Sequence, residues 1–120
     1  MSVSSKHPPK QLKRHWFQIL LALADQDQHG LGIMNEVLER TGGAMRLWPG
    51  MLYGSLKLMT EQGLILETAA PAEAESGGGR PRYYRITDDG RGALVAEVKR
   101  LSAFVDAARA KNLLDDVDRA

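Results

Sequence analysis

Three arginines stand close together in the second half of the chain, and their spacing suits the binding of a polyanion. Arg80, Arg82 and Arg85 fall within six residues, in the segment GGGRPRYYRITDDGR. Guanidinium groups form charge-assisted, often bidentate hydrogen bonds with phosphate, so such a cluster is typical of contacts with a nucleic-acid backbone. The first 24 residues contain no acid and carry Lys6, Lys10, Lys13 and Arg14. Because the net charge is only +1, the local distribution of charge, and not the total, favours a polyanion.

Other chemistries lack the residues that they need. The chain has no cysteine, which excludes disulfides, thiolate metal sites and cysteine nucleophiles. His7, His15 and His29 have no ligand-like spacing, so neither a metal nor a cofactor is expected. No Gly-Lys-Ser/Thr follows the glycine run as a phosphate-binding P-loop would require. Asp88 and Asp89 are explained by the negative charge that a helix N-terminus favours. We therefore expect a protein that is not an enzyme.

The spacing of apolar residues predicts three helices ahead of the arginines. The first helix starts at Lys10 and ends near residues 25–30, and the second closes at the glycine pair 42–43 in a left-handed cap. The third helix begins at Pro49, because proline is favoured at the first helical position, and it stops at Gly63.

The third helix is predicted to carry one buried and one exposed face. Leu52, Leu56 and Met59 recur at helical spacing and form the buried stripe. The residues expected toward the exposed side are Met51, Tyr53, Ser55 and Lys57.

Two strands should follow, over residues 64–68 and 82–86, joined by a polar loop at 69–79. This order predicts a mainly α fold with a small β-hairpin, the layout of a winged helix-turn-helix. In that layout one helix enters a DNA groove and the hairpin touches the flanking backbone. The basic hairpin is expected to hold adjacent phosphates or to reach into the minor groove.

The last helix is predicted to start after Thr87, which can cap it, and to run to about Leu114. A helix of that length cannot be covered by so small a domain, so its apolar seam needs a partner, for which a second copy is the simplest choice. The seam consists of Leu94, Val98, Leu101, Phe104, Val105 and Ala108. The expected organisation is a flexible arm at 1–9, a winged helix-turn-helix domain at 10–91, a dimerisation helix at 92–114 and a tail at 115–120.

Four segments of the chain resemble the PadR family of bacterial transcriptional regulators. They are HGLGI at 29–33, RTGG at 40–43, PGMLYGSLKLMTEQGLI at 49–65 and GGRPRYYRITDDGR at 78–91. The resemblance implies a dimeric winged-helix repressor that leaves its operator when a small molecule binds. It assigns DNA contacts to Met51, Tyr53, Ser55 and Lys57 on the recognition helix and to Arg80 and Arg82 on the wing.

The chain departs from the family pattern at three positions. Trp48 stands where a small capping residue is common, Met51 where a small hydroxyl residue is usual, and Leu58 where a basic residue is usual. These changes make the reading face less hydrophilic and leave the buried stripe intact.

The sequence also leaves alternatives open. Trp16 on the first helix could line a pocket for a flat aromatic effector, or it could be an ordinary core or dimer anchor. A winged helix that binds only proteins is the rival to a regulator that binds double-stranded DNA at an inverted repeat. The longest apolar run, residues 19–24, is too short to cross a membrane, so a soluble cytoplasmic protein is expected.

Overall fold

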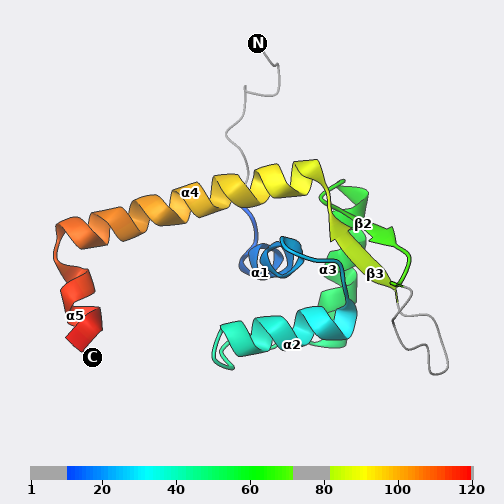
Figure 1. Ribbon diagram of the computed structural model, residues 1–120, viewed down its shortest axis with the longest axis horizontal. Coiled ribbons are helices and arrows are strands. Elements are labelled where there is room, and N and C mark those ends of the chain that lie inside the picture. Colours follow the sequence, from blue (N-terminus) through cyan, green and yellow to red (C-terminus); the bar gives the residue numbers. More distant parts are fainter. Residues whose placement is uncertain (1–10, 72–81, 120) are drawn as a thin grey trace, which may run out of the picture.

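The computed structural model describes residues 11–71 and 82–119 (Figure 1). The predicted arm at 1–9, most of the predicted loop at 69–79, and Arg80 lie outside these residues. The described elements are α1 (Arg14–Leu23), β1 (Gln28–His29), α2 (Gly30–Arg40), α3 (Pro49–Glu61), β2 (Ile65–Thr68), β3 (Tyr83–Ile86), α4 (Asp88–Ala110) and α5 (Leu113–Arg119).

Several predicted helix ends are confirmed. α3 begins at Pro49, and Gly63 ends it with a φ of 77°, a backbone conformation that favours glycine. The pair Gly42 and Gly43 after α2 also has positive φ values. The hydroxyl of Thr87 caps α4 by accepting a hydrogen bond from the Gly90 backbone N–H at 3.0 Å.

The sheet has one more strand than the sequence predicted. Its order is β1-β3-β2, and both pairings are antiparallel. In the β1–β3 pair, Gln28 lies opposite Tyr84 and His29 lies opposite Tyr83. Since β1 follows α1 and leads straight into α2, this pairing ties the start of α2 to the wing strands.

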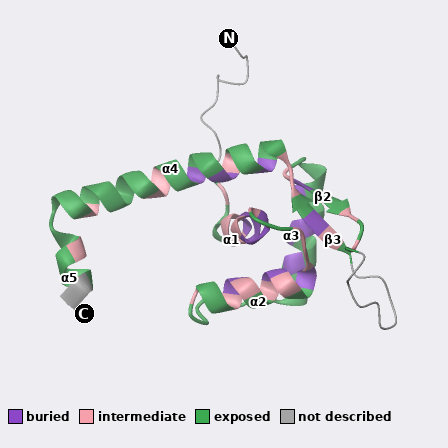
Figure 2. Ribbon diagram, in the orientation of Figure 1, coloured by how far each residue is buried: buried purple, intermediate pink, exposed green. Residues whose placement is uncertain are grey.

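The core lies around α1, which packs between α2 and α4 (Figure 1). Helices α1 to α4 and strands β2 and β3 all contribute buried apolar residues. The ribbon of buried residues is purple in Figure 2. The largest fully buried ones are Ile19, Leu20, Leu23, Ile33, Val37, Leu47, Leu52, Leu56, Met59 and Ile65.

The C-terminal part of the chain differs from its prediction. The last helix was predicted to continue to about Leu114, but α4 ends at Ala110. Asn112 then adopts a left-handed conformation with φ 64°, and the residues assigned to a tail are helical up to Arg119. Asparagine tolerates this conformation because its short polar side chain can bond locally. α4 projects from the rest of the chain, and α5 leaves its end in a different direction (Figure 1).

Candidate nucleic-acid interface

One hydroxyl group makes side-chain hydrogen bonds to both sides of the turn between α2 and α3. The Thr41 hydroxyl donates to the Val37 carbonyl oxygen at 2.8 Å and accepts from the Met45 backbone N–H at 3.0 Å. Leu47, farther along the same turn, is 1% exposed and so anchors the segment in the core. These contacts fix where α3 starts relative to α2.

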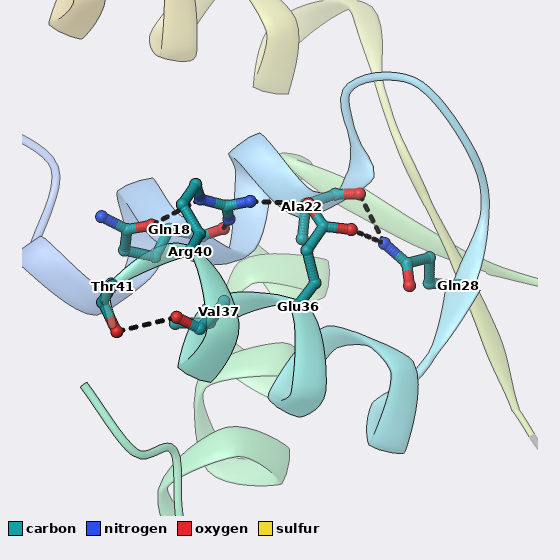
Figure 3. A network of polar contacts seen from close by, with 7 residues as sticks. All are labelled: Gln18, Ala22, Gln28, Glu36, Val37, Arg40 and Thr41. Carbon is teal, nitrogen blue, oxygen red and sulfur yellow. Dashed lines mark hydrogen bonds and ion pairs between the residues drawn. The ribbon is translucent and has the colours of Figure 1, made fainter. Parts of the chain in front are cut away.

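A network of polar contacts joins α2 to α1 (Figure 3). The Arg40 guanidinium donates to the Gln18 carbonyl oxygen at 3.0 Å and to the Glu36 carboxylate at 2.6 Å. The Gln28 side-chain amide donates to the same Glu36 carboxylate and to the Ala22 carbonyl oxygen, each at 2.7 Å. Isolated surface ion pairs contribute little, but these groups share partners and span two helices. The network therefore fixes α2 against α1.

The side of α3 that lies opposite its buried stripe is largely exposed to solvent. Its Met51 side chain is 44% exposed and Tyr53 is 49% exposed, and Lys57 is also exposed. Three of the four predicted recognition-helix residues thus lie at the surface.

The prediction for the fourth residue is wrong, because Ser55 is only 5% exposed. Ser55 follows Leu52 by three residues and precedes Met59 by four, so the helical period places it within the buried stripe. A small side chain fits there without widening the stripe. Ser55 has almost no surface left for a DNA contact.

Tyr53 leans against the first residue of α2. A Cβ atom added at Gly30 would lie 2.3 Å from the Tyr53 hydroxyl oxygen, well inside contact distance. The absence of a side chain at Gly30 thus leaves room for the Tyr53 ring beside the start of α2.

Tyr84 is a buried residue of β3, the central strand of the sheet. Burial raises the pKa of the Tyr84 hydroxyl, and the Glu67 carboxylate raises it further. The positive charge of Arg82 lowers this pKa in part. Tyr53 reaches Gly30, which directly follows β1, and β1 pairs with β3, so the exposed side of α3 lies next to the wing strands.

The wing arginines have different environments. The Arg82 side chain is 72% exposed and lies 3.5 Å from the Glu67 carboxylate. Because this ion pair is exposed, a DNA phosphate could take the place of the carboxylate. The Arg85 guanidinium instead makes a bidentate pair with Asp27, with a shortest distance of 2.8 Å. Their hydrogen bond lowers the pKa of Asp27 and raises that of Arg85. Arg85 thus already has a carboxylate partner, on the strand face opposite Tyr84.

His29 links the start of α2 to the wing. Its Nδ1 accepts a hydrogen bond from the Gly32 backbone N–H at 3.1 Å and so caps α2. Its ring stacks on Tyr83, with 5.2 Å between the ring centroids. No sequence pattern indicates this role, because it depends on the two-residue strand β1.

A groove lies beside Trp16, between the start of α1, the end of α3 and α4. Its volume is about 380 Å³. Trp16 itself is only 6% exposed and belongs to the core, and the Lys13 ammonium lies 5.2 Å from its ring centroid. The residues that line the groove are Gln11, Leu12, Lys13, Trp16, Leu58, Gln62, Leu64 and Ala93.

The predicted seam on α4 divides into two parts. Leu94 is 4% exposed and belongs to the core of this chain, so its assignment to a dimer seam is corrected. Leu101 and Ala108 are half-buried. Val98, Phe104 and Val105 remain 45%, 60% and 45% exposed. The exposed apolar face thus begins at Val98, about one helical turn after Leu94.

Neither a metal cluster nor a membrane span occurs in the described part of the chain. Residues 11–71 and 82–119 contain no group of three or more His, Cys, Asp or Glu side chains able to hold a metal ion. None of the helices in these two ranges is long and apolar enough to span a membrane.

Comparison with known proteins gives a family and a fold. Residues 19–96 match the model of the "Transcriptional regulator PadR-like family". No curated protein sequence matches the chain. Among solved structures, a PadR family transcription regulator from Clostridium difficile has a TM-score of 0.67 and 24% identity, over 82% of this chain and 97% of its own.

Two further structures share the fold. RosR of H. salinarum has a TM-score of 0.62 and 24% identity, over 91% of this chain and 96% of its own. Bacillus subtilis PadR in complex with operator DNA has a TM-score of 0.60 and 21% identity, over 72% of this chain and 47% of its own. These matches confirm the winged-helix fold predicted from the order of the elements. Both the family and the fold are those of transcription regulators.

Proposed function

The chain belongs to the PadR-like family of transcriptional regulators, as its motifs indicated, and from this premise we propose that it is a homodimeric repressor that binds operator DNA sequence-specifically. The observation that carries the proposal is the surface formed by the exposed side of α3 and the adjacent wing strands. On it Tyr53 reaches Gly30 beside β1, Arg82 is exposed next to β3, and Lys57 is exposed on the same helix as Tyr53. The complex of Bacillus subtilis PadR with operator DNA supports this use of the fold.

Each exposed residue has a separate part in the proposed complex. Lys57 and Arg82 would bind phosphates, since flexible or forked cations on a surface suit the DNA backbone. Tyr53 would place its hydroxyl against a phosphate or a base edge. Met51 can contact a thymine methyl group, which is the apolar feature of the major groove. Arg80 is proposed as a second wing cation from the sequence alone.

The dimer is proposed through α4. Its residues Val98, Phe104 and Val105 are 45–60% exposed in the single chain. A second copy related by a two-fold axis would cover them with the same residues. It would also supply a second α3 for the other half of an inverted repeat.

The release of DNA by a small molecule is also proposed. The groove beside Trp16 has the size of a small-ligand site, and leucine and tryptophan side chains line much of it. Since α1, α3 and α4 all border the groove, a flat aromatic ligand there could change the angle between the reading helix and the dimer helix. The test is to titrate flat aromatic compounds into the complex and to follow the release of labelled DNA, in wild type and in Trp16→Leu.

The experiment that tests DNA binding is the salt dependence of affinity for duplex DNA, measured by fluorescence anisotropy. Replacing Arg82 or Lys57 with Ala should weaken binding and flatten the slope of log affinity against log salt by about 1 for each phosphate that the variant no longer binds. Arg85→Ala is the matched control, because Arg85 is paired with Asp27 on the other strand face. If the chain bound another protein and had no affinity for duplex DNA at low salt, the rival hypothesis of a protein-interaction module would be favoured.

A further inference from the structure

Trp48 is an exposed tryptophan at the amino-terminal end of α3. Its side chain is 62% exposed, although tryptophan is usually largely buried in folded proteins. It occupies the position before the first residue of α3, and its side chain makes no capping hydrogen bond there. Serine, threonine, aspartate and asparagine are strongly preferred at that position because they bond the free N–H groups. Trp48 therefore neither packs in the core nor stabilises the start of the helix.

Arg46 lies over the Trp48 ring. Its guanidinium carbon is 5.4 Å from the ring centroid, within the range of a cation–π contact. Within residues 11–71 and 82–119, Arg46 makes no ion pair. The first turn of α3 contains no acidic residue. The two side chains thus present an aromatic face and a positive charge that no described carboxylate neutralises.

This pair continues the surface already assigned to DNA. Met51, which is 44% exposed, follows Trp48 by three residues and lies in the first turn of α3. In helix-turn-helix proteins the amino-terminal residues of the recognition helix contact base edges. An aromatic ring beside a cation fits the sugars, base edges and phosphates of a DNA strand, whereas an apolar protein surface would leave the Arg46 charge without a partner.

We propose that Trp48 and Arg46 extend the DNA-reading surface beyond the amino-terminal end of α3. The Trp48 indole lies against sugars and base edges at the wall of the major groove, and Arg46 binds the adjacent phosphate. This inference rests on the proposed DNA binding. It also accounts for an apolar residue at a helix start, where a capping residue would give a more stable helix but no contact with DNA.

The first test uses Trp48→Ser, which should change stability and DNA affinity in opposite directions. Serine can cap α3, so the thermal midpoint should rise by roughly 2–6 °C. Removal of the ring should weaken binding about tenfold, measured by anisotropy on a labelled duplex that the protein selects from a random-sequence library. If Trp48 only covered the start of α3, the variant would keep its affinity, and that result would overturn the proposal.

The second test needs no change to the protein. The chain has two tryptophans, and Trp16 is buried, so quenching of the fluorescence by acrylamide reports mainly on Trp48. Binding of the selected duplex should lower the quenching constant several-fold, and Trp48→Phe should remove the quenchable part of the signal. A bound duplex with unchanged quenching would overturn the inference and leave the proposed function standing. Protection that grows with protein concentration in the absence of DNA would instead assign Trp48 to a contact between copies. A protein that binds no duplex would overturn both proposals.

Arg46→Ala gives an independent measurement. It should flatten the salt slope by about 1, the value for one phosphate, as for the wing cation, whereas Arg85→Ala should leave the slope unchanged. An unchanged slope for Arg46→Ala would remove Arg46 from the interface.

Discussion

The body of the molecule and its C-terminal arm differ in how far their apolar residues are buried. In the body, made of α1 to α3, the sheet and the start of α4, every core residue is 6% exposed or less. In the arm, made of the end of α4 and α5, the apolar side chains of Phe104, Val105, Leu113 and Val117 are 45–65% exposed (Figure 2). The body thus has a core of its own within one chain, whereas residues 102–117 of the arm include no buried residue.

Polar contacts show the same division. In the body they join distant parts of the chain, as Arg85 does with Asp27 and Arg40 with Gln18. In the arm the ion pair of Arg109 with Asp106 lies within one helical turn. Such a pair supports the helix itself and contributes nothing to its placement. The contacts that position the reading surface thus lie within the single chain, and in the proposed dimer the second copy would position the arm.

The largest expected effect comes from a charge in the exposed part of the arm. Val105→Asp would place two like charges in the dimer seam and should weaken dimerisation by about 3 kcal/mol or more, over a hundredfold in Kd. The fold of each chain should remain, because Val105 is exposed in the single chain. Sedimentation should show a monomer.

Val95→Asp is the matched control for that change. Val95 lies on the same helix, is 46% exposed and is not one of the predicted seam residues, so its substitution should leave the dimer intact. A dimeric Val105→Asp variant, or equal effects of the two substitutions, would contradict the assigned seam.

The next largest effect concerns the body. Leu56→Ala removes a side chain that is 1% exposed and should lower the free energy of unfolding by about 2–5 kcal/mol. Leu58→Ala, on the same helix but at 45% exposure, should change it by about 0.5 kcal/mol or less. Urea unfolding at one fixed protein concentration measures both. Equal decreases would contradict the difference in burial between Leu56 and Leu58.

A smaller effect is expected where the body positions a reading residue. Gly30→Ala brings a methyl group against the Tyr53 hydroxyl, and the flexible ring should swing away with little change in stability. DNA affinity should fall about tenfold, the contribution of roughly one good hydrogen-bonded pair at a base edge. Gly92→Ala, in open space on α4, should not change affinity. An unfolded Gly30→Ala variant, or one with full affinity, would mean that Gly30 does not orient Tyr53.

The smallest effect lies where the body meets the arm. Hydrogen bonds from Arg100 and from the Leu12 backbone N–H lower the pKa of Glu97 below its ordinary value of 4.5. A carboxyl group with a lowered folded-state pKa stabilises the fold above its unfolded-state pKa, and this stabilisation disappears as the pH falls through the folded-state value. Wild type should therefore exceed Glu97→Gln in stability at pH 7, and the difference should shrink below about pH 4.5. Thermal unfolding over a pH series measures this, and a difference independent of pH would contradict the assigned hydrogen bonds.

Local signals were enough to predict most of the body. Pro49, Gly63 and Thr87 act through their own backbone or side-chain chemistry, so α3 and the start of α4 could be placed from the sequence. The strand β1 could not, because two residues carry no periodic pattern and become a strand only by pairing with β3.

The errors at the site have physical reasons too. Ser55 was assigned by its polarity, although its helical position places it in the buried stripe. Leu94 continues the heptad pattern of α4, yet the pattern alone cannot tell a core contact from a contact between copies. The exposure of Trp48 and the partner of Arg85 depend on distant parts of the chain, so only the structure supplies them.

The most direct test of the central claim is the affinity for an operator whose half-sites are moved apart by half a turn. A reading surface on each copy, joined by the arms, requires both α3 helices to enter major grooves on one face of the DNA. The half-site centres should then lie about one helical turn, roughly 34 Å or 10 base pairs, or a small multiple of that, apart in an inverted repeat. Inserting about 5 base pairs between them should reduce the affinity to that of a single half-site. Unchanged affinity after this insertion, or a footprint on a direct repeat, would contradict the proposed dimer.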